Sequence, residues 1–155
     1  MADMNSEDLP PLPDEAKALV QQRIEEEHGY LSWLNTRVET VESGRIVLTI
    51  PFDEKLTNSD GQTIHGGVAA TLVDTAGGLV QRTSFQNPLD GGVATVNLNV
   101  NYLLPAEGDL RATGEIVRAG GSVGVSEMRV LSDTDEQSDP VEVVAAQGSY
   151  RLFRK

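Results

Sequence analysis

The sequence predicts an α+β fold in which an antiparallel sheet wraps around one long helix. Residues 65–84 form the longest segment with helical periodicity, and small apolar residues dominate it. From residue 92 onward the hydrophobic pattern changes to a period of two, which is typical of strands. A single sheet packed around the long helix is the simplest arrangement that buries the apolar residues of both.

The first part of the chain is predicted as an arm followed by a helix. Residues 1–13 are acidic and rich in proline, and we expect them to form a flexible arm. A single domain would then span residues 14–155. Apolar residues recur at helical spacing in residues 14–28, and Gly29 is the predicted end of this helix.

Two strands are expected before the long helix, at residues 31–41 and 45–52, with a turn at residues 43–44 between them. A polar loop at residues 57–63 leads from the second strand into the helix.

Four strands are predicted after the long helix. The first of them ends near residue 102, and the others lie at about 108–118, 122–132 and 141–152. An acidic hairpin tip at residues 132–140 separates the last two. In the first strand, alternation predicts that the apolar set faces one way and the polar set the other. The apolar set is Val96, Leu98, Val100 and Tyr102, and the polar set is Thr95, Asn97, Asn99 and Asn101.

The composition is that of an acidic globular protein. The 155 residues suffice for one domain, and 24 acidic against 12 basic residues give a formal net charge of -12. This charge argues against nucleic acid and anionic membrane surfaces as partners. No apolar run reaches the ~18 residues that a membrane span needs. The chain has no cysteine, which excludes disulfides and thiolate chemistry and favours a cytoplasmic protein. The acidic balance also leads to the hypothesis of a halophilic protein.

The start of the long helix carries the most specific chemical signal. A His65-Gly66-Gly67 turn precedes it, and the free N–H groups of a helix start can hold a carbonyl oxygen or an oxyanion. Asp74 lies two turns further on, among small residues that leave room beside its carboxylate. The glycine pair 77–78 predicts close packing of a second helix or of a ligand. The stripe expected on the sheet consists of Val68, Leu72, Thr75, Ala76 and Leu79.

The spacing of Gly66 and Asp74 predicts an oligomer. Eight residues of helix separate them, which is about 12 Å along the axis. One reacting carbonyl therefore cannot contact the Gly66 N–H and the Asp74 carboxylate of the same chain. If both act together, they come from two subunits, as in a two-fold dimer with antiparallel central helices and two equal sites.

The chain resembles the hotdog-fold thioesterases, and in particular the branch that includes the phenylacetic-acid-pathway acyl-CoA thioesterase. The resemblance is carried by the His65-Gly66-Gly67 turn, by residues 70–74 and by the strand at residues 96–106. It covers about residues 30–153. It implies a hotdog fold and an acyl-CoA thioesterase for small or aromatic acyl groups, working as a homodimer or homotetramer with its site at the subunit interface.

The resemblance also implies roles for single residues. Gly66 would donate its N–H to the thioester oxygen, and Asp74 of the other subunit would be the nucleophile or the general base. Asn58 would help to place water or the thioester, Thr95 would supply a hydroxyl near the carboxylate, and His65 would orient the loop. Hydrolysis of this kind needs an oxyanion site and a water activator, and no metal or cofactor.

Two features depart from the pattern of the family. The loop from Asn58 to His65 is one residue longer than usual. Where relatives carry a basic turn for the phosphates of coenzyme A, this chain has Arg118 followed by Gly120 and Gly121. By resemblance these three residues would bind the phosphates, and Gly67 would be a further substrate contact.

Two other functions are compatible with the resemblance. A hotdog protein can bind acyl-CoA as a sensor or carrier without hydrolysing it. An acyl-CoA hydratase on the same fold would need an Asp and a His on a differently patterned helix, which this sequence lacks. Asp74 favours hydrolysis over binding alone.

Overall fold

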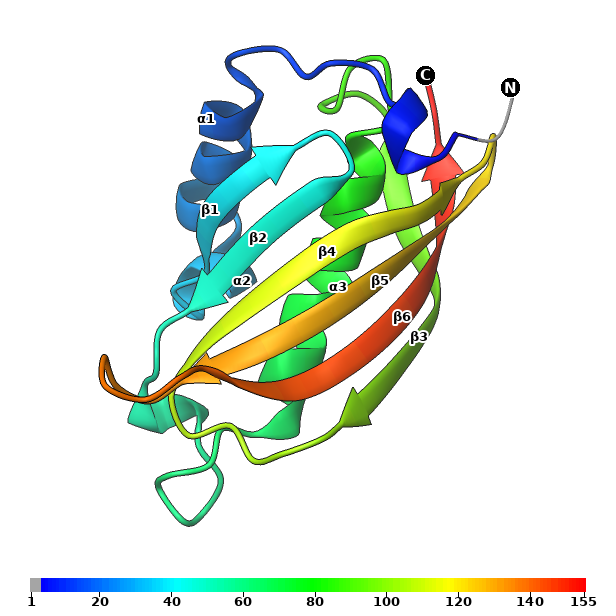
Figure 1. Ribbon diagram of the computed structural model, residues 1–155. Coiled ribbons are helices and arrows are strands. Elements are labelled where there is room, and N and C mark those ends of the chain that lie inside the picture. Colours follow the sequence, from blue (N-terminus) through cyan, green and yellow to red (C-terminus); the bar gives the residue numbers. More distant parts are fainter. Residues whose placement is uncertain (1–3) are drawn as a thin grey trace.

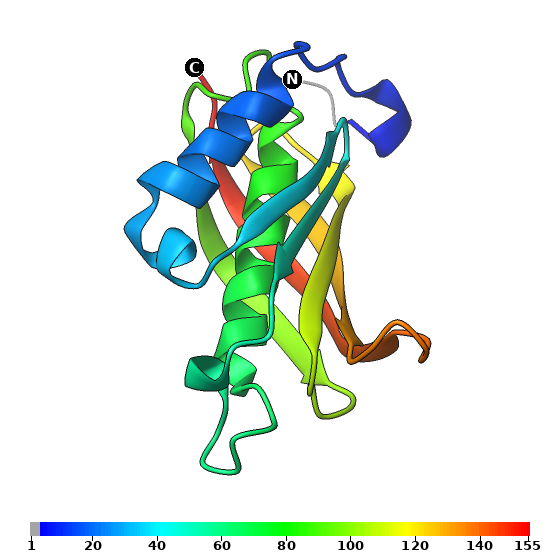
Figure 2. The same ribbon diagram turned by 90° about the vertical axis from the view of Figure 1, so that its left-hand side faces the viewer.

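The computed structural model describes residues 4–155 and shows a six-stranded sheet that curves around one helix (Figures 1 and 2). The strands are β1 (Arg37–Glu42), β2 (Arg45–Ile50), β3 (Gly92–Tyr102), β4 (Asp109–Ala119), β5 (Val123–Asp133) and β6 (Val141–Phe153). Their order in the sheet is β1-β2-β4-β5-β6-β3, and every neighbouring pair is antiparallel. The predicted α+β class is confirmed.

The central helix is α3 (Gly66–Arg82), which lies in the concave face of the sheet (Figure 1). Its most deeply buried apolar side chains are Leu72, Val73, Ala76 and Val80. The predicted stripe is correct for Val68, Leu72 and Ala76, which are all buried in the core. Thr75 and Leu79, which were expected on the sheet, are half-buried at its side and line a cavity instead, because the sheet is centred on the Val73 side of the helix.

Gly77 of α3 packs against a strand side chain rather than against a second helix or a ligand. A Cβ at Gly77 would lie 2.0 Å from the Tyr150 hydroxyl oxygen and 2.8 Å from the Met128 sulfur. Tyr150 projects from β6 and is completely buried. The missing side chain at Gly77 is therefore what allows helix and sheet to approach each other around the Tyr150 ring.

Three short helical segments cover the side of α3 that the sheet leaves open (Figure 2). They are α1 (Ala16–Gln21), the π-helix η2 (Gln22–Glu27) and α2 (Gly29–Trp33). The helix predicted at residues 14–28 ends where it was expected, at the extended C-cap His28, but the strand predicted from residue 31 is wrong, because α2 occupies Gly29–Trp33 and β1 begins at Arg37. His28 accepts a hydrogen bond from the Leu31 N–H and caps this helix, and both Leu31 and Leu34 point into the core.

Residues 4–13 contact the domain at several positions. Met4 exchanges two backbone hydrogen bonds with Ala119 of β4, and the 3₁₀ turn η1 (Ser6–Asp8) follows. The Ser43 hydroxyl donates to the Pro10 carbonyl at 2.7 Å, and Leu9 packs on the core. The flexibility predicted for this arm stays a prediction, and residues 1–3 lie outside the described residues.

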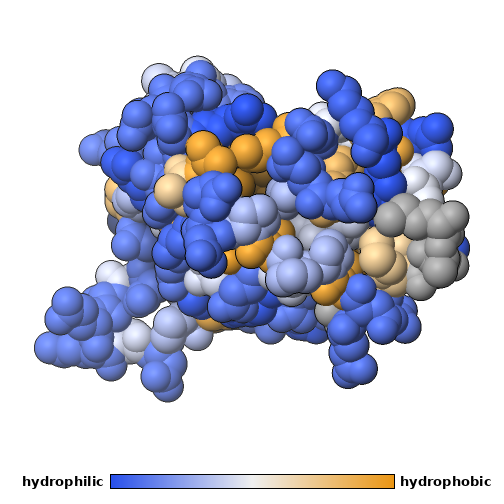
Figure 3. Space-filling view, turned by 90° about the horizontal axis from the view of Figure 1, so that it is seen from above, coloured by the Kyte–Doolittle hydropathy of each residue, from blue (hydrophilic) through white to orange (hydrophobic). Residues whose placement is uncertain are grey.

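One end of the molecule has a mostly hydrophilic surface (Figure 3). Seen from the end where both termini lie, most side chains are hydrophilic, and hydrophobic ones gather in a recess between them (Figure 3).

A further short 3₁₀ turn, η3 (Glu54–Leu56), leads into the loop before α3. None of the helices within residues 4–155 has the length and apolar character needed to cross a bilayer.

Candidate active site

Asp74 lies on the side of α3, half-buried, and is held by a residue from the edge of the sheet. The Thr95 hydroxyl on β3 donates a hydrogen bond of 2.7 Å to Asp74 Oδ1. A hydroxyl donating to a carboxylate makes a short and comparatively strong bond. The structure thus brings together two residues that lie 21 positions apart in the sequence.

A β-bulge at Val96 is what turns Thr95 toward the helix. Thr95 pairs with Tyr150 of β6, and Asn97 pairs with the adjacent Ser149, so Val96 is an extra residue in β3. The extra residue shifts the alternation, so odd-numbered residues before the bulge and even-numbered residues after it face the same side of β3. The prediction that Thr95 faces away from Leu98 is wrong, since both lie on the helix side of β3 and Val96 is 66% exposed.

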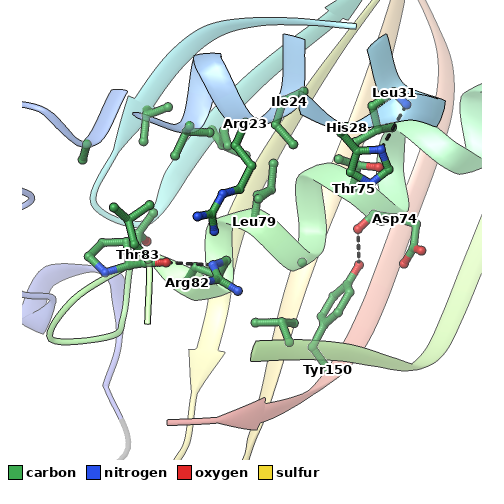
Figure 4. A pocket seen from close by; sticks show the side chains of 18 of the residues that line it. Arg23, Ile24, His28, Leu31, Asp74, Thr75, Leu79, Arg82, Thr83 and Tyr150 are labelled. Carbon is green, nitrogen blue, oxygen red and sulfur yellow. Dashed lines mark hydrogen bonds between the residues drawn. The ribbon is translucent and has the colours of Figure 1, made fainter. Parts of the chain in front are cut away.

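Tyr150 completes the wall beneath Asp74, and the sequence did not single it out. Its hydroxyl donates to the Asp74 backbone oxygen at 3.4 Å (Figure 4). Burial, with the Asp74 charge adding to it, raises the pKa of Tyr150, so the group stays a protonated donor. The sequence signal was the space left by Gly77 and by Gly148, where a Cβ would also collide with the Tyr150 ring.

The start of α3 presents one backbone N–H for which residues 4–155 supply no acceptor. His65 is the N-cap, and its Nδ1 accepts from the Gly67 N–H at 2.9 Å. The Gly66 N–H has no acceptor among residues 4–155. Tyr102 of β3 donates to the Gly66 carbonyl at 2.8 Å, and a Cβ at Gly66 would lie 3.0 Å from its ring. The N–H that could bind a ligand is therefore that of Gly66, because the Gly67 N–H already donates to the His65 side chain.

Asn58 and Gly66 line the same cavity, of about 380 Å³, at the start of α3. Asn58 is exposed in the loop before the helix, where its N–H donates to the Thr63 carbonyl. Asp74 and Thr95 line a different cavity. Within one chain, then, the structure places the proposed oxyanion donor and the carboxylate in two separate hollows, as their spacing along the helix requires.

The turn between β4 and β5 lies near the other end of α3. Arg118 and Gly121 are exposed. The Gly120 N–H donates to the Val123 carbonyl, so the turn itself uses this group. Arg154 donates both to the Gly120 carbonyl at 3.0 Å and to the carbonyl of Ser84, just beyond the helix. The predicted phosphate contacts are therefore remote from Gly66 of the same chain.

The cavity beside Asp74 has a volume of about 330 Å³ and runs between α3, the α1–α2 segment and β3 (Figure 4). This is near the lower limit of the ~300–1,000 Å³ typical of ligand pockets. Apolar side chains make up most of the lining, and Asp74 is the single carboxylate among its described residues. Three or more acidic or histidine side chains placed to hold a metal occur nowhere within residues 4–155.

Comparison with known sequences finds one family. The sequence matches the thioesterase superfamily over residues 61–138. It is 47% identical over 145 residues to a Halobacterium salinarum protein named "Putative esterase", covering 91% of this chain and 95% of that one. It is 32% identical over 101 residues to the Escherichia coli protein named medium/long-chain acyl-CoA thioesterase YigI, covering 57% of this chain and 62% of that one.

Comparison with solved structures confirms the hotdog fold. A thioesterase family protein from Silicibacter pomeroyi matches with a TM-score of 0.78 at 23% identity, over 89% of this chain and 98% of that one. The PaaI protein of the Escherichia coli phenylacetic acid degradation operon matches with a TM-score of 0.72 at 19% identity, over 90% and 97% of the two chains. At these identities the likeness establishes the fold.

Proposed function

Because this chain belongs to the thioesterase superfamily, we propose that it hydrolyses acyl-CoA thioesters to the free acid and coenzyme A. The observation that carries the proposal is the setting of Asp74. Its carboxylate is half-buried, one oxygen is bound by Thr95, and an apolar cavity opens beside it. A cavity of about 330 Å³ suits a small or aromatic acyl group.

The geometry supports two versions of the reaction. In the first, Asp74 takes a proton from water, and the resulting hydroxide attacks the thioester carbonyl. In the second, the carboxylate attacks directly and water hydrolyses the acyl-enzyme anhydride. In both, the tetrahedral oxyanion would accept a hydrogen bond from the Gly66 N–H of a partner subunit. The C–S bond then breaks, and the leaving thiolate together with the proton that the reacting water gives up forms the free thiol of coenzyme A.

A two-fold dimer through β3 would assemble the complete site. β3 is an edge strand, and an edge offers unpaired N–H and C=O groups to another strand. Val96, Tyr102, Leu103 and Leu104 are exposed in or next to it. Antiparallel pairing of two β3 strands would set the two α3 helices side by side, so that Gly66 of one chain approaches Asp74 of the other. A homotetramer would be a pair of such dimers.

Thiol release from a panel of acyl-CoA esters tests the proposal, with Asp74→Asn as the decisive variant. Its kcat should fall by about 100-fold or more, because the amide cannot activate water or attack. The matched control is Asp139→Asn, which changes an exposed carboxylate in the β5–β6 hairpin and should leave kcat unaltered.

Binding of the same esters to Asp74→Asn, measured by calorimetry, separates the possible outcomes. Retained binding with lost turnover supports the assigned role of Asp74. If the variant keeps its kcat within about threefold of the wild type, Asp74 is structural and the proposal fails. Esters that bind to the wild-type protein without thiol release would instead indicate a sensor or carrier.

A further inference from the structure

Two arginines from different elements converge on the cavity beside Asp74. Arg23 projects from η2, Arg82 is the last residue of α3, and both line the cavity. Figure 4 shows the Arg23 side chain extending toward Arg82. In a chain of net charge -12, two guanidinium groups thus face one apolar hollow whose described lining contains a single carboxylate.

Neither arginine is neutralised by a carboxylate of the described chain. Arg82 donates through Nε to the Pro88 carbonyl at 2.7 Å, and its other nitrogens form no ion pair within residues 4–155. The Arg23 guanidinium makes neither a hydrogen bond nor an ion pair with any described residue. Within residues 4–155, these two cations of the lining thus form no ion pair.

The two charges also act on each other. Burial, and then the positive charge of Arg23, lower the pKa of Arg82, whereas Asp90 acts in the opposite direction. Like charges near an apolar cavity raise the free energy of the unliganded protein, and an anion between them would lower it. The positive charges of Arg23 and Arg82 therefore favour binding of a negatively charged group at the arginine end of the cavity.

The arginine end of the cavity is separated from the catalytic end by apolar surface. Asp74 and Arg82 are eight residues apart on α3, which is about 12 Å along the axis. Val20, Ile24 and Leu79 contribute to the lining. A ligand with its thioester carbonyl at Asp74 would thus extend over apolar side chains and place its far end at the arginines.

We propose that the preferred acyl group ends in a carboxylate, which Arg23 and Arg82 bind at the far end of the cavity. The substrate class is then a CoA monothioester of a dicarboxylic acid. Guanidinium groups suit this role because their planar N–H pairs match the two oxygens of a carboxylate. The inference rests on the proposed function, since Asp74 marks the position of the thioester.

The test compares CoA esters of equal chain length with and without the distal carboxylate. Adipoyl-CoA is compared with hexanoyl-CoA, suberoyl-CoA with octanoyl-CoA, and coenzyme A itself serves as a third arm. Affinity is measured by calorimetry on the Asp74→Asn variant, and kcat/KM by thiol release on the enzyme with Asp74. Each measurement is repeated with Arg23→Gln and with Arg129→Gln, which removes an equal charge from an exposed ion pair with Glu142.

The wild-type pocket should favour the carboxylate ester by about tenfold or more in affinity and in kcat/KM. Arg23→Gln should abolish most of this preference, and Arg129→Gln should retain it. Arg23 is largely exposed, and an unchanged melting temperature will show that the variant folds.

Other results have distinct meanings. Equal affinity for the paired esters, or equal behaviour of the two arginine variants, overturns the inference. If Arg23→Gln weakens coenzyme A and all esters alike, the anion is a CoA phosphate and the inference is wrong. If the preference appears in binding but no ester is hydrolysed, the proposed function fails while the anion site stands.

Discussion

The Thr95 hydroxyl distinguishes the two oxygens of the Asp74 carboxylate. Oδ1 accepts the 2.7 Å hydrogen bond, so Oδ2 is the oxygen that can face water or a thioester. A hydrogen bond to a charged group contributes about 1.5–3 kcal/mol, mainly by fixing the position and charge of the acceptor. In the proposed mechanism, Thr95 is thus a positioning residue for the Asp74 carboxylate.

Replacing Thr95 by valine should lower kcat by about 10- to 100-fold, because the shape is kept while the donor is lost. Thr95→Ser retains the hydroxyl and should recover most of the lost rate. Both kcat values come from thiol release at a saturating ester concentration. Equal rates for the valine and serine variants would show that the hydroxyl does not act on Asp74.

The adjacent glycines 77 and 78 provide a second test at the scale of single residues. A Cβ at Gly77 would meet the Tyr150 hydroxyl at 2.0 Å, whereas one at Gly78 would meet the Tyr150 ring at 3.6 Å, which is ordinary contact. Gly77→Ala should therefore destabilise the fold by about 1–3 kcal/mol. Gly78→Ala should stabilise it by up to about 1 kcal/mol through helix propensity.

Denaturant unfolding of the two glycine variants measures this difference. Adding Tyr150→Phe to Gly77→Ala should restore part of the stability, since the closest colliding atom is the hydroxyl oxygen. Two alanine variants of equal stability would show that the Tyr150 ring does not hold the helix at this distance from the sheet.

The sequence located Asp74 and its small-residue surroundings because these belong to one contiguous helix. Tyr150 and Arg23 were missed, since only the folded sheet and the α1–α2 segment bring them to that helix. Thr95 was identified by resemblance, but its orientation was wrong because a bulge leaves no mark in residue composition. Local pattern thus predicted Gly66 and Asp74 on α3 but not Arg82, and tertiary structure determined which residues lie beside them.

At the scale of elements, the strands β4, β5 and β6 follow the predicted ranges to within about a residue, because alternation is clear in each. The segment before β1 does not follow the predicted range. Leu31 and Leu34 were assigned to a strand, but their spacing of three suits one turn of helix, and the His28 cap starts α2 there. Short helices depend on such caps more than on their propensity.

The N-terminus of α3 is the element whose role can be isolated most cleanly. Gly66→Pro removes the unused N–H, and proline suits the first helical position, preceded here by His65 with φ -57° and ψ 131°. Gly66→Ala adds a similar Cβ against Tyr102 and keeps the N–H. The proline variant should lose about 100-fold in kcat relative to the alanine variant, as expected for one oxyanion donor. Similar kcat values would place the oxyanion site elsewhere.

The exposed edge of β3 should hold the dimer together. Val96→Lys places a charge on this edge and should convert the dimer to monomers, as measured by analytical ultracentrifugation, with loss of turnover. The control is Val117→Lys, because Val117 is 46% exposed on β4, an interior strand of the sheet. A dimeric Val96→Lys variant would exclude β3 as the contact.

At the scale of the whole molecule, the separation of the two cavities predicts that subunits complement each other. A heterodimer of Asp74→Asn and Gly66→Pro would contain one doubly damaged site and one intact site if the residues act across the interface. Its activity should recover to about half that of the wild-type dimer. Differently tagged subunits allow the heterodimer to be purified, and each homodimer serves as an inactive control. An inactive heterodimer would show that both residues act within one chain.

The bulge in β3 links two properties that could otherwise change independently during evolution. Because strands have a period of two, deleting Val96 would turn either Val93 and Thr95 or Leu98 and Val100 away from the helix. The same deletion would remove the side chain that protrudes from the sheet edge. If Asp74 reacts and β3 forms the dimer contact as proposed, alignment of the carboxylate and recognition of a second subunit both depend on one inserted residue. We expect descendants of this chain to keep both or to lose both in a single step.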